Sequence, residues 1–416
     1  MFSKTFKSSW INTLRDNMFV GIVGKPSCGK STFFKAATLA EVEIANYPFT
    51  TIKPNHAVGF VKIPDVAKDF GKSANPREGY VLDKWRFVPI DLMDVAGLVP
   101  GAHKGLGMGS QFLDDLRQAD ALVHVIDASG SVNEKGEPVD VGSYDPVNDV
   151  RFLEEELDFW YLDIMKRGWD KFARQIMQEK LDVNKALAKQ LSALKVNEKM
   201  VESSVKKLVL DPEKPGSWTD DQLLSLAKEL RRLTKPMIIA ANKIDMQTAK
   251  DNVARLKKEF PDYNIIPCSA ESELALREAA KHSLIEYVPG EKGCSIIAED
   301  KLNDKQKQAI GFIKKNVLDI FGTTGVQEVL NAAIFDLLKY IAIHPGGVGK
   351  LEDSEGRVIP DCFLMPEGTT ALQFAYKLHT DFGKNFIRAI DVKTKMTVGK
   401  EHVLKNLDIL EIVAGK

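Results

Sequence analysis

The stretch Gly24-Lys25-Pro26-Ser27-Cys28-Gly29-Lys30-Ser31 decides the fold of this chain. It follows the apolar run Phe19–Val23 and precedes Thr32 and a series of helix-forming residues. A β-branched run, a loop bounded by glycines that ends in Gly-Lys-Ser, and then a helix is the order that a phosphate-binding loop requires. Its glycines let backbone N–H groups surround phosphates, and the helix N-terminus adds a partial positive charge. The sequence therefore predicts that Gly24 to Thr32 bind a nucleotide.

The end of the phosphate loop and a later Asp-x-x-Gly motif complete the expected phosphate site. Lys30 is expected to reach the β- and γ-phosphates, and the Ser31 hydroxyl to ligate Mg²⁺. Residues 88–97 read as a strand that ends in Asp-x-x-Gly. Asp94 is expected to hold Mg²⁺ through its water shell, and the Gly97 N–H to sense the γ-phosphate.

Two further segments have the composition of nucleotide-sensitive loops. Residues 42–55 contain two prolines and an asparagine around Thr50 and Thr51, which favours an extended loop. Thr51, with Thr50 as the substitute, is expected to close over the γ-phosphate and to complete the Mg²⁺ shell. Residues 97–109 hold five glycines in thirteen positions, which gives the backbone high conformational freedom. Lys30, Thr51 and Gly97 are therefore the predicted catalytic residues.

The position after Gly97 differs from that of many GTPases. They place a water-orienting glutamine there, whereas this chain has Leu98, which can neither orient nor activate water. His103 and Lys104 follow in the glycine-rich loop, where a solvated surface pair is the favoured interpretation. His124 lies inside the apolar run of residues 121–127 and is interpreted as a packed core imidazole.

A base-recognition motif follows a second apolar run. Asn242-Lys243-Ile244-Asp245 comes directly after residues 236–241. Asp245 can accept hydrogen bonds from guanine N1–H and N2–H₂, which adenine does not offer. Lys243 is expected to stack along the base and Asn242 to brace the loops. The backbone of Ser269 and Ala270, after the run at residues 265–268, is expected to meet guanine O6. All of these residues follow strands, at the edge where open α/β sheets bind ligands.

The length of 416 residues indicates two or three domains. Residues 151–235 have apolar side chains at heptad-like spacing, which predicts an antiparallel, coiled-coil helical arm inserted into an α/β domain with a mostly parallel sheet. After residue 340 the composition shifts to short strands and turns. The expected domains are a nucleotide-binding domain at 1–150 and 236–288, the helical insertion at 151–235, connecting helices at 289–340 and a small C-terminal domain at 341–416.

Composition excludes several classes of protein. With 44% hydrophobic and 28% charged residues and a formal net charge of −1, the chain is expected to be a globular protein without a global attraction to nucleic acid or membranes. Its four scattered cysteines suggest neither a disulfide framework nor a zinc site and favour a reducing, cytoplasmic location. No run reaches the ~18–20 apolar residues of a membrane span. Residues 1–17 resemble a transit peptide only loosely, and a surface extension is the favoured interpretation.

The motifs together resemble those of the Obg-like GTPases, in particular the YchF-type branch. Pro48–Asn55, Asp94–Gly105 and Asn242–Asp245 occur in family order after the phosphate loop, and the helical arm precedes the base motif as in that branch. Residues 364–370 and 408–413 look like a TGS domain, a ubiquitin-like β-grasp module. The resemblance implies a P-loop G domain with a coiled-coil arm and a TGS domain, and a link to the ribosome or to translation, with RNA as a candidate TGS partner.

Two features depart from the family pattern. The best-known members of this branch have lost Asn-Lys-x-Asp and prefer ATP, whereas this chain keeps the motif, which favours GTP and GDP as ligands. Ser27 occupies the position where K⁺-dependent relatives use asparagine as a cation ligand, so K⁺ stimulation stays open. The interpretation favoured by these residues is a slow, Mg²⁺-dependent GTPase. Its alternatives are an ATP-preferring, YchF-like ATPase and a binding module with negligible turnover.

Overall fold

A computed structural model describes residues 18–39, 56–95 and 115–415. A seven-stranded sheet forms the centre of the G domain, with strand order β2-β4-β1-β5-β6-β7 and β3 paired with β4. β1, β4, β5, β6 and β7 are parallel, while β2 and β3 run antiparallel to β4. The strands are β1 (Phe19–Val23), β2 (His56–Pro64), β3 (Tyr80–Leu82), β4 (Trp85–Asp94), β5 (Ala121–Asp127), β6 (Met237–Asn242) and β7 (Ile265–Pro267).

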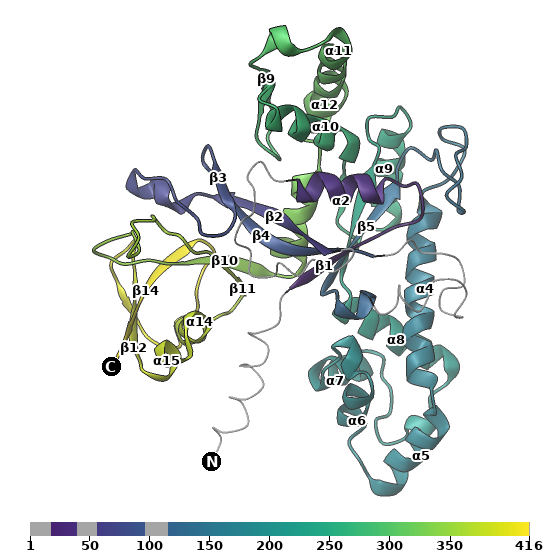
Figure 1. The fold of residues 1–416 in the computed structure, drawn as a ribbon. Helices are drawn as coiled ribbons and strands as arrows, with labels where there is room; N and C mark the ends of the chain where they lie inside the picture. Colours follow the sequence, from purple (N-terminus) through teal and green to yellow (C-terminus); the bar gives the residue numbers. More distant parts are fainter. Residues whose placement is uncertain (1–17, 40–55, 96–114, 416) are drawn as a thin grey trace.

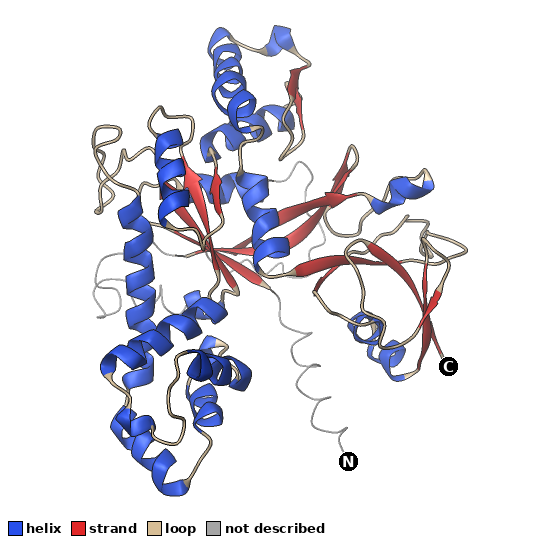
Figure 2. Cartoon of the chain, turned by 180° about the vertical axis from the view of Figure 1, so that it is seen from behind, coloured by secondary structure: helices blue, strands red, loops and turns tan. Residues whose placement is uncertain are grey.

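Helices cover both faces of this sheet, as Figures 1 and 2 show. Every residue of β5 and β6 is buried, because parallel strands at the centre of a two-sided sheet have no solvent face. On one face α2 (Lys30–Thr38) and α13 (Val326–Asn331) pack against β1, β5 and β6, and on the other α4 (Val147–Lys166) and α8 (Asp220–Thr234) do. α9 (Ala249–Glu259) and α10 (Ala270–Lys281) follow the last two strands. This is the doubly wound, mostly parallel architecture that the sequence predicted.

The inserted residues form a helical arm, which extends away from the sheet at the lower right of Figure 1. The helical insertion is confirmed, but it is not one continuous heptad pair. Gly168, Lys180 and Lys195 take positive φ angles of 72°, 50° and 62°, and each ends or separates helices. Between α4 and α8 lie α5 (Trp169–Glu179), α6 (Val183–Gln190), the 3₁₀ turn η3 (Ser192–Leu194), α7 (Glu198–Lys207) and the turn η4 (Pro215–Ser217).

The segment that connects the G domain to the C-terminal domain ends beside β2, the edge strand of the G-domain sheet. The Asn331 side chain accepts from the Lys62 N–H and donates to the Lys62 carbonyl, both over 2.8 Å, so it occupies the backbone groups of this edge strand. Two π-helical turns interrupt the helices. The elements are β8 (Ile285–Tyr287), β9 (Cys294–Ile296), η5 (Glu299–Lys301), α11 (Asp304–Ile313), η6 (Lys314–Leu318), α12 (Asp319–Phe321), α13 and η7 (Ala332–Leu337).

The C-terminal residues form a second, five-stranded sheet with the order β11-β10-β14-β12-β13. Thr370 and Gln373 make a capping box at the start of α14, as expected for a short helix that begins there. The mixed sheet with two short helices confirms the predicted β-grasp module. Its elements are β10 (Tyr340–Pro345), β11 (Phe363–Pro366), α14 (Ala371–Leu378), α15 (Thr380–Lys384), β12 (Phe386–Asp391), β13 (Thr397–Val398) and β14 (Asp408–Ala414).

This C-terminal domain packs on the G domain beside the start of β4 and the short helix η1 (Val66–Phe70). The buried Arg86 guanidinium donates from Nη1 to the Ile359 carbonyl over 2.6 Å and from Nη2 to the Pro360 carbonyl over 2.8 Å. An apolar cluster with members from both domains surrounds these bonds. The two domains therefore share one packed interface.

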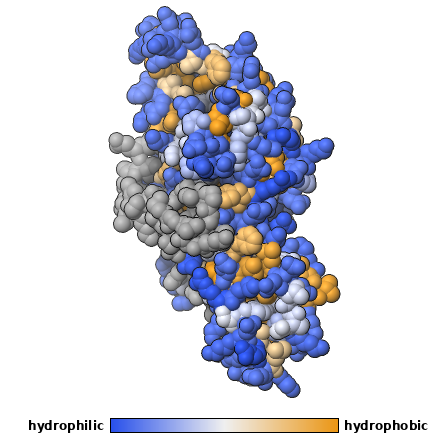
Figure 3. Space-filling model, turned by 90° about the vertical axis from the view of Figure 1, so that its right-hand side faces the viewer, coloured by the Kyte–Doolittle hydropathy of each residue, from blue (hydrophilic) through white to orange (hydrophobic). Residues whose placement is uncertain are grey.

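The surface seen in Figure 3 is mainly hydrophilic, with its largest apolar area where the helical arm leaves the G domain. Within residues 18–39, 56–95 and 115–415, no helix combines the length and the apolar character that crossing a bilayer requires.

Candidate functional site

The phosphate loop lies between the end of β1 and the start of α2, and its shape depends on two glycines. A Cβ on Gly24 would lie 2.5 Å from the Val125 carbonyl oxygen, so β5 approaches the loop too closely for any side chain. Gly29 has a φ of 93°, and a Cβ there would lie 2.2 Å from Nδ2 of Asn242. Ser27 also has a positive φ, 61°. These turns produce the curled backbone that the sequence predicted.

The side chains of the loop divide into buried and exposed groups. Pro26, Ser27 and Ser31 are exposed, and Thr32 is half-buried. Cys28 is fully buried, and burial raises the pKa of its thiol to about 12, which keeps it neutral and unreactive. The Lys25 side chain is also buried, with its ammonium paired to Asp149 instead of lying open in the loop.

Lys30 and Asp94 meet at the edge of the sheet where the parallel strands have their carboxyl ends. Asp94 ends β4 and lies in register with Ile22 of β1, one strand from the phosphate loop. The Lys30 ammonium forms an ion pair with Oδ1 of Asp94, and both side chains are largely buried. A carboxylate and a hydroxyl are the hard oxygen ligands that Mg²⁺ prefers, so Asp94 and Ser31 fit the predicted metal site.

Asn242 connects the base motif with the phosphate loop. Its Nδ2 donates to the Cys28 carbonyl over 3.0 Å, and its Oδ1 accepts from the Ala270 N–H over 3.0 Å. The amide therefore braces both loops, the role that the sequence predicted for it.

The Asp245 carboxylate is oriented by the next loop along the sheet edge. Its Oδ1 accepts from the Ser269 hydroxyl over 2.7 Å, and that hydroxyl also contacts the Ser272 hydroxyl at 2.8 Å. Ser269 is fully buried and caps α10, so its position is fixed by the helix start. The arrangement gives Asp245 a defined orientation.

The backbone donors expected to meet guanine O6 have partners within the protein. The Ser269 N–H donates to the Thr324 carbonyl over 2.8 Å, and the Ala270 N–H donates to Asn242. Gly325 packs so closely that a Cβ there would lie 2.0 Å from the Pro267 carbonyl oxygen. A base carbonyl would therefore have to share these donors, and the role of both residues in base contact stays a prediction.

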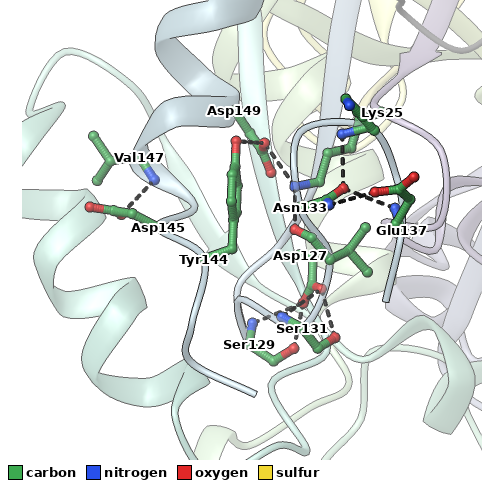
Figure 4. Close-up of polar contacts among 12 residues, drawn as sticks. Lys25, Asp127, Ser129, Ser131, Asn133, Glu137, Tyr144, Asp145, Val147 and Asp149 are labelled. Atoms are coloured by element: carbon green, nitrogen blue, oxygen red, sulfur yellow. Dashed lines mark hydrogen bonds and ion pairs between the residues drawn. The ribbon is translucent and has the colours of Figure 1, made fainter. Parts of the chain in front are cut away.

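Lys243 has a partner that sequence reasoning missed. Its backbone has a φ of 65°, and its Nζ lies 3.0 Å from Oδ2 of Asp127 and 3.2 Å from the Ser131 hydroxyl. Asp127 is fully buried at the end of β5, where Ser129 and Ser131 also donate to its carboxylate (Figure 4). These donors and the Lys243 charge lower its pKa against the opposing effect of burial. Asp127 ends a strand and begins the run Asp-Ala-Ser, and this position was the available signal.

The remaining predicted residues have different outcomes. His124 is buried, and desolvation followed by the Lys25 charge lowers its pKa to about 3, which confirms a neutral core imidazole. Thr50, Thr51, Gly97, Leu98, His103 and Lys104 lie outside the described residues, as does the N-terminal extension.

Comparison with known proteins gives three matching family models. Residues 19–149 match a 50S ribosome-binding GTPase model, residues 240–346 the G4 motif-containing domain of the YGR210-like Obg-like GTPases, and residues 350–414 the TGS domain. These matches include every described residue of the candidate site.

Similar proteins cover nearly the whole chain. An uncharacterized GTP-binding protein of Methanocaldococcus jannaschii is 48% identical over 95% of this chain and 99% of its own length. The ribosome-binding ATPase YchF of Bacillus subtilis is 30% identical over 89% of this chain and 87% of its own. The crystal structure of a GTP binding protein from Pyrococcus horikoshii aligns with a TM-score of 0.75 and 41% identity, covering 96% of this chain and all of that one. The chain thus belongs to the YGR210-like subfamily of the Obg-like GTPases, which is related to YchF and combines a G domain with a C-terminal TGS domain.

Proposed function

We propose that this protein binds GTP and hydrolyses it slowly to GDP and phosphate, as a nucleotide-dependent conformational switch. The observation that carries the proposal is the Asp245 carboxylate, held by the Ser269 hydroxyl beside Asn242. Guanine offers N1–H and N2–H₂ to such a carboxylate, whereas adenine would leave it without those donors. GTP-binding relatives from two archaea support the same ligand.

The chemistry follows from the phosphate side of the site. Lys30 would exchange its pairing with Asp94 for the β- and γ-phosphates and would stabilise the charge of the transferring phosphoryl group. Ser31 and Asp94, with Thr51, would hold Mg²⁺, which supplies further neutralisation of phosphate charge when bound. Leu98 stands where many GTPases have glutamine, and the sequence offers no evident arginine finger. We therefore expect slow intrinsic turnover.

A ribosome or a ribosome-associated factor is the proposed partner. One matching family is described as 50S ribosome-binding, and the YchF relative of Bacillus subtilis is named ribosome-binding. The TGS domain is the proposed contact for RNA or protein, and a cytoplasmic location accords with these partners. K⁺ stimulation stays open, since Ser27 replaces the asparagine ligand of K⁺-dependent relatives.

Side-by-side titration with GTP, GDP and ATP in the presence of Mg²⁺ tests the ligand. We expect at least ~100-fold tighter binding of GTP than of ATP, because a polar site rejects a ligand that leaves its groups unpaired. Equal affinity for ATP would contradict the guanine assignment and favour the ATPase alternative that the name of the Bacillus relative suggests.

A phosphate-release assay, run with and without ribosomes, tests turnover. Slow release of phosphate from GTP is expected from the protein alone, and faster release with ribosomes would support the proposed partner. If GTP binds but phosphate is not released under either condition, the protein is a nucleotide-stabilised binding module.

A further inference from the structure

The segment between β5 and α4, residues 128–146, is an ordered loop beside the nucleotide site. The backbone donates from Asn133 to Glu137 over 3.0 Å, from Val139 to Ser131 over 2.9 Å and from Gly142 to Ser129 over 2.9 Å. An isolated β-bridge joins its two halves. These contacts make the segment a compact hairpin-like support, which we call the β5–α4 loop.

The β5–α4 loop and the start of α4 surround the ammonium of Lys25 (Figure 4). Lys25 Nζ lies 2.9 Å from Oδ1 of Asp149, donates to the Val132 carbonyl over 2.7 Å and lies 3.8 Å from the centre of the Tyr144 ring. The Tyr144 hydroxyl donates to the same Asp149 oxygen over 3.0 Å. Only 6% of the Lys25 side chain and 5% of the Asp149 side chain are exposed.

The same loop touches the site at two more places. A Cβ on Gly136, where φ is 84°, would lie 2.6 Å from Cβ of Pro26, so the loop packs directly on the phosphate loop. Near the start of the β5–α4 loop, the Ser129 carbonyl accepts from the Thr248 hydroxyl over 2.7 Å. Thr248 follows the base motif by three residues. The support thus contacts both halves of the proposed GTP site.

We propose that Lys25 is a positioning residue, which uses Asp149 and the β5–α4 loop to hold the first half of the phosphate loop in its phosphate-binding shape. The inference rests on the proposed nucleotide binding and deepens it. The Lys25 ammonium is directed at three groups of the β5–α4 loop and α4, so it orients the backbone of the phosphate loop and does not bind the phosphates itself.

The Lys25–Asp149 pair affects the geometry of the phosphate loop more than the stability of the fold. Desolvation largely cancels the attraction within a buried ion pair, so such a pair adds little net stability, but removing one partner leaves a costly unpaired charge. Burial raises the pKa of Asp149 to about 6, against the opposing effect of the Lys25 charge. Because the pair restricts Lys25 to one position, it also restricts the adjoining backbone N–H groups of the phosphate loop.

The matched test compares Asp149→Asn with Asp158→Asn. Both carboxylates are buried on α4 and pair with a buried cation, but Asp158 pairs with Arg231 of α8, 2.9 Å away, in the helical arm. We expect Asp149→Asn to weaken binding of a fluorescent GDP by about 10- to 100-fold, the scale of a small displacement of binding groups. Asp158→Asn should lower Tm without changing the GDP affinity.

Two further measurements separate positioning from general damage. Guanosine has no phosphate, so it should bind Asp149→Asn and the wild type equally. Lys25→Met should weaken GDP binding to a similar degree, and the double variant should lose less than the sum of the single losses. If Asp149→Asn does not fold, Tyr144→Phe replaces it as the test, because it removes only the hydroxyl that donates to Asp149. We expect a smaller but measurable loss of GDP affinity in Tyr144→Phe.

Three results would overturn the inference. They are unchanged GDP affinity in the folded Asp149 and Tyr144 variants, equal losses in the Asp149 and Asp158 variants, and equal losses for GDP and guanosine. Failure of the wild-type protein to bind GDP or GTP would instead contradict the proposed function, so the two failures are distinguishable.

Discussion

The side-chain amide of Asn242 donates to the carbonyl oxygen of Cys28 over 3.0 Å, across 214 positions of the sequence. One side chain thereby fixes the distance between the base motif and the phosphate loop. Its Oδ1 holds the Ala270 N–H at the same time. This amide therefore links the two halves of the site directly.

Asn242→Ala should leave two buried backbone groups without partners, at a cost of about 1–3 kcal/mol each. We expect lower stability and a clear loss of GDP affinity, measured by urea unfolding and by titration. Asn331→Ala is the control, because it also removes two side-chain-to-backbone bonds, but at the β2 edge. If both variants lose GDP affinity equally, the bracing role of Asn242 is wrong.

Lys30→Ala should lower the rate of GTP hydrolysis at least ~100-fold, since a preorganised positive charge at the phosphates is removed. The fold should persist, because Lys30 contributes an ion pair and no core packing. Lys35, exposed on the same helix, provides the control variant Lys35→Ala. Turnover unchanged in a correctly folded Lys30→Ala protein would exclude the phosphate-loop assignment.

Asp245→Asn should shift base preference from GTP toward xanthosine triphosphate. The new amide donates where the carboxylate accepted, and the C2 carbonyl of xanthine accepts where the guanine amino group donated. Ser269 can still donate to the remaining oxygen, so the loop should keep its shape. Competition titration with the two nucleotides measures the shift. A variant that retains full preference for GTP would show that Asp245 does not contact the base.

The local parts of the site could be predicted from the sequence. The phosphate loop, Asp94 and Asn242 each follow a buried strand, and the carboxyl ends of parallel strands meet at one edge. The partners of Lys25 could not be predicted in this way. Asp149 and Tyr144 belong to no motif, and a long loop brings them to the phosphate loop only in the folded chain.

The positions at which the helices of the arm end could not be predicted from the sequence pattern either. Lys180 and Lys195 adopt left-handed backbone conformations, and nothing in a lysine indicates this, whereas Gly168 could be suspected. The apolar spacing continues through all three positions, so periodicity predicts helix without showing where the chain turns. Tertiary packing decides those breaks.

Arg86→Met should destabilise the junction between the G and TGS domains by about 2–4 kcal/mol, because two carbonyls lose a charged donor. Arg77 crosses the same junction through 2.8 Å pairs with Asp353 and Asp361, but its side chain is 43% exposed. Exposed pairs contribute about 0–1 kcal/mol, so Arg77→Met should have a small effect. Thermal unfolding and limited proteolysis compare the two. Equal effects would contradict the central role of Arg86.

Two buried imidazoles should make stability depend on pH. Desolvation, with nearby positive charges of Arg86 and Lys25 respectively, lowers the pKa of His344 and of His124 from 6.5 to about 3. Between these values the unfolded chain binds a proton at each imidazole and the folded chain does not. Stability therefore rises with pH in this window, and it is lost as the pH falls. Asp149, with its pKa raised to about 6, acts in the opposite direction between about 4 and 6.

His344→Leu should reduce this pH dependence by about one proton, or about 1.4 kcal/mol per pH unit between pH 6 and 4. A constant change of stability from altered packing leaves the slope of stability against pH unchanged. Urea unfolding at a series of pH values measures the slope for the wild type and the variant. An unchanged slope in His344→Leu would show that His344 takes up its proton in the folded chain as readily as in the unfolded one.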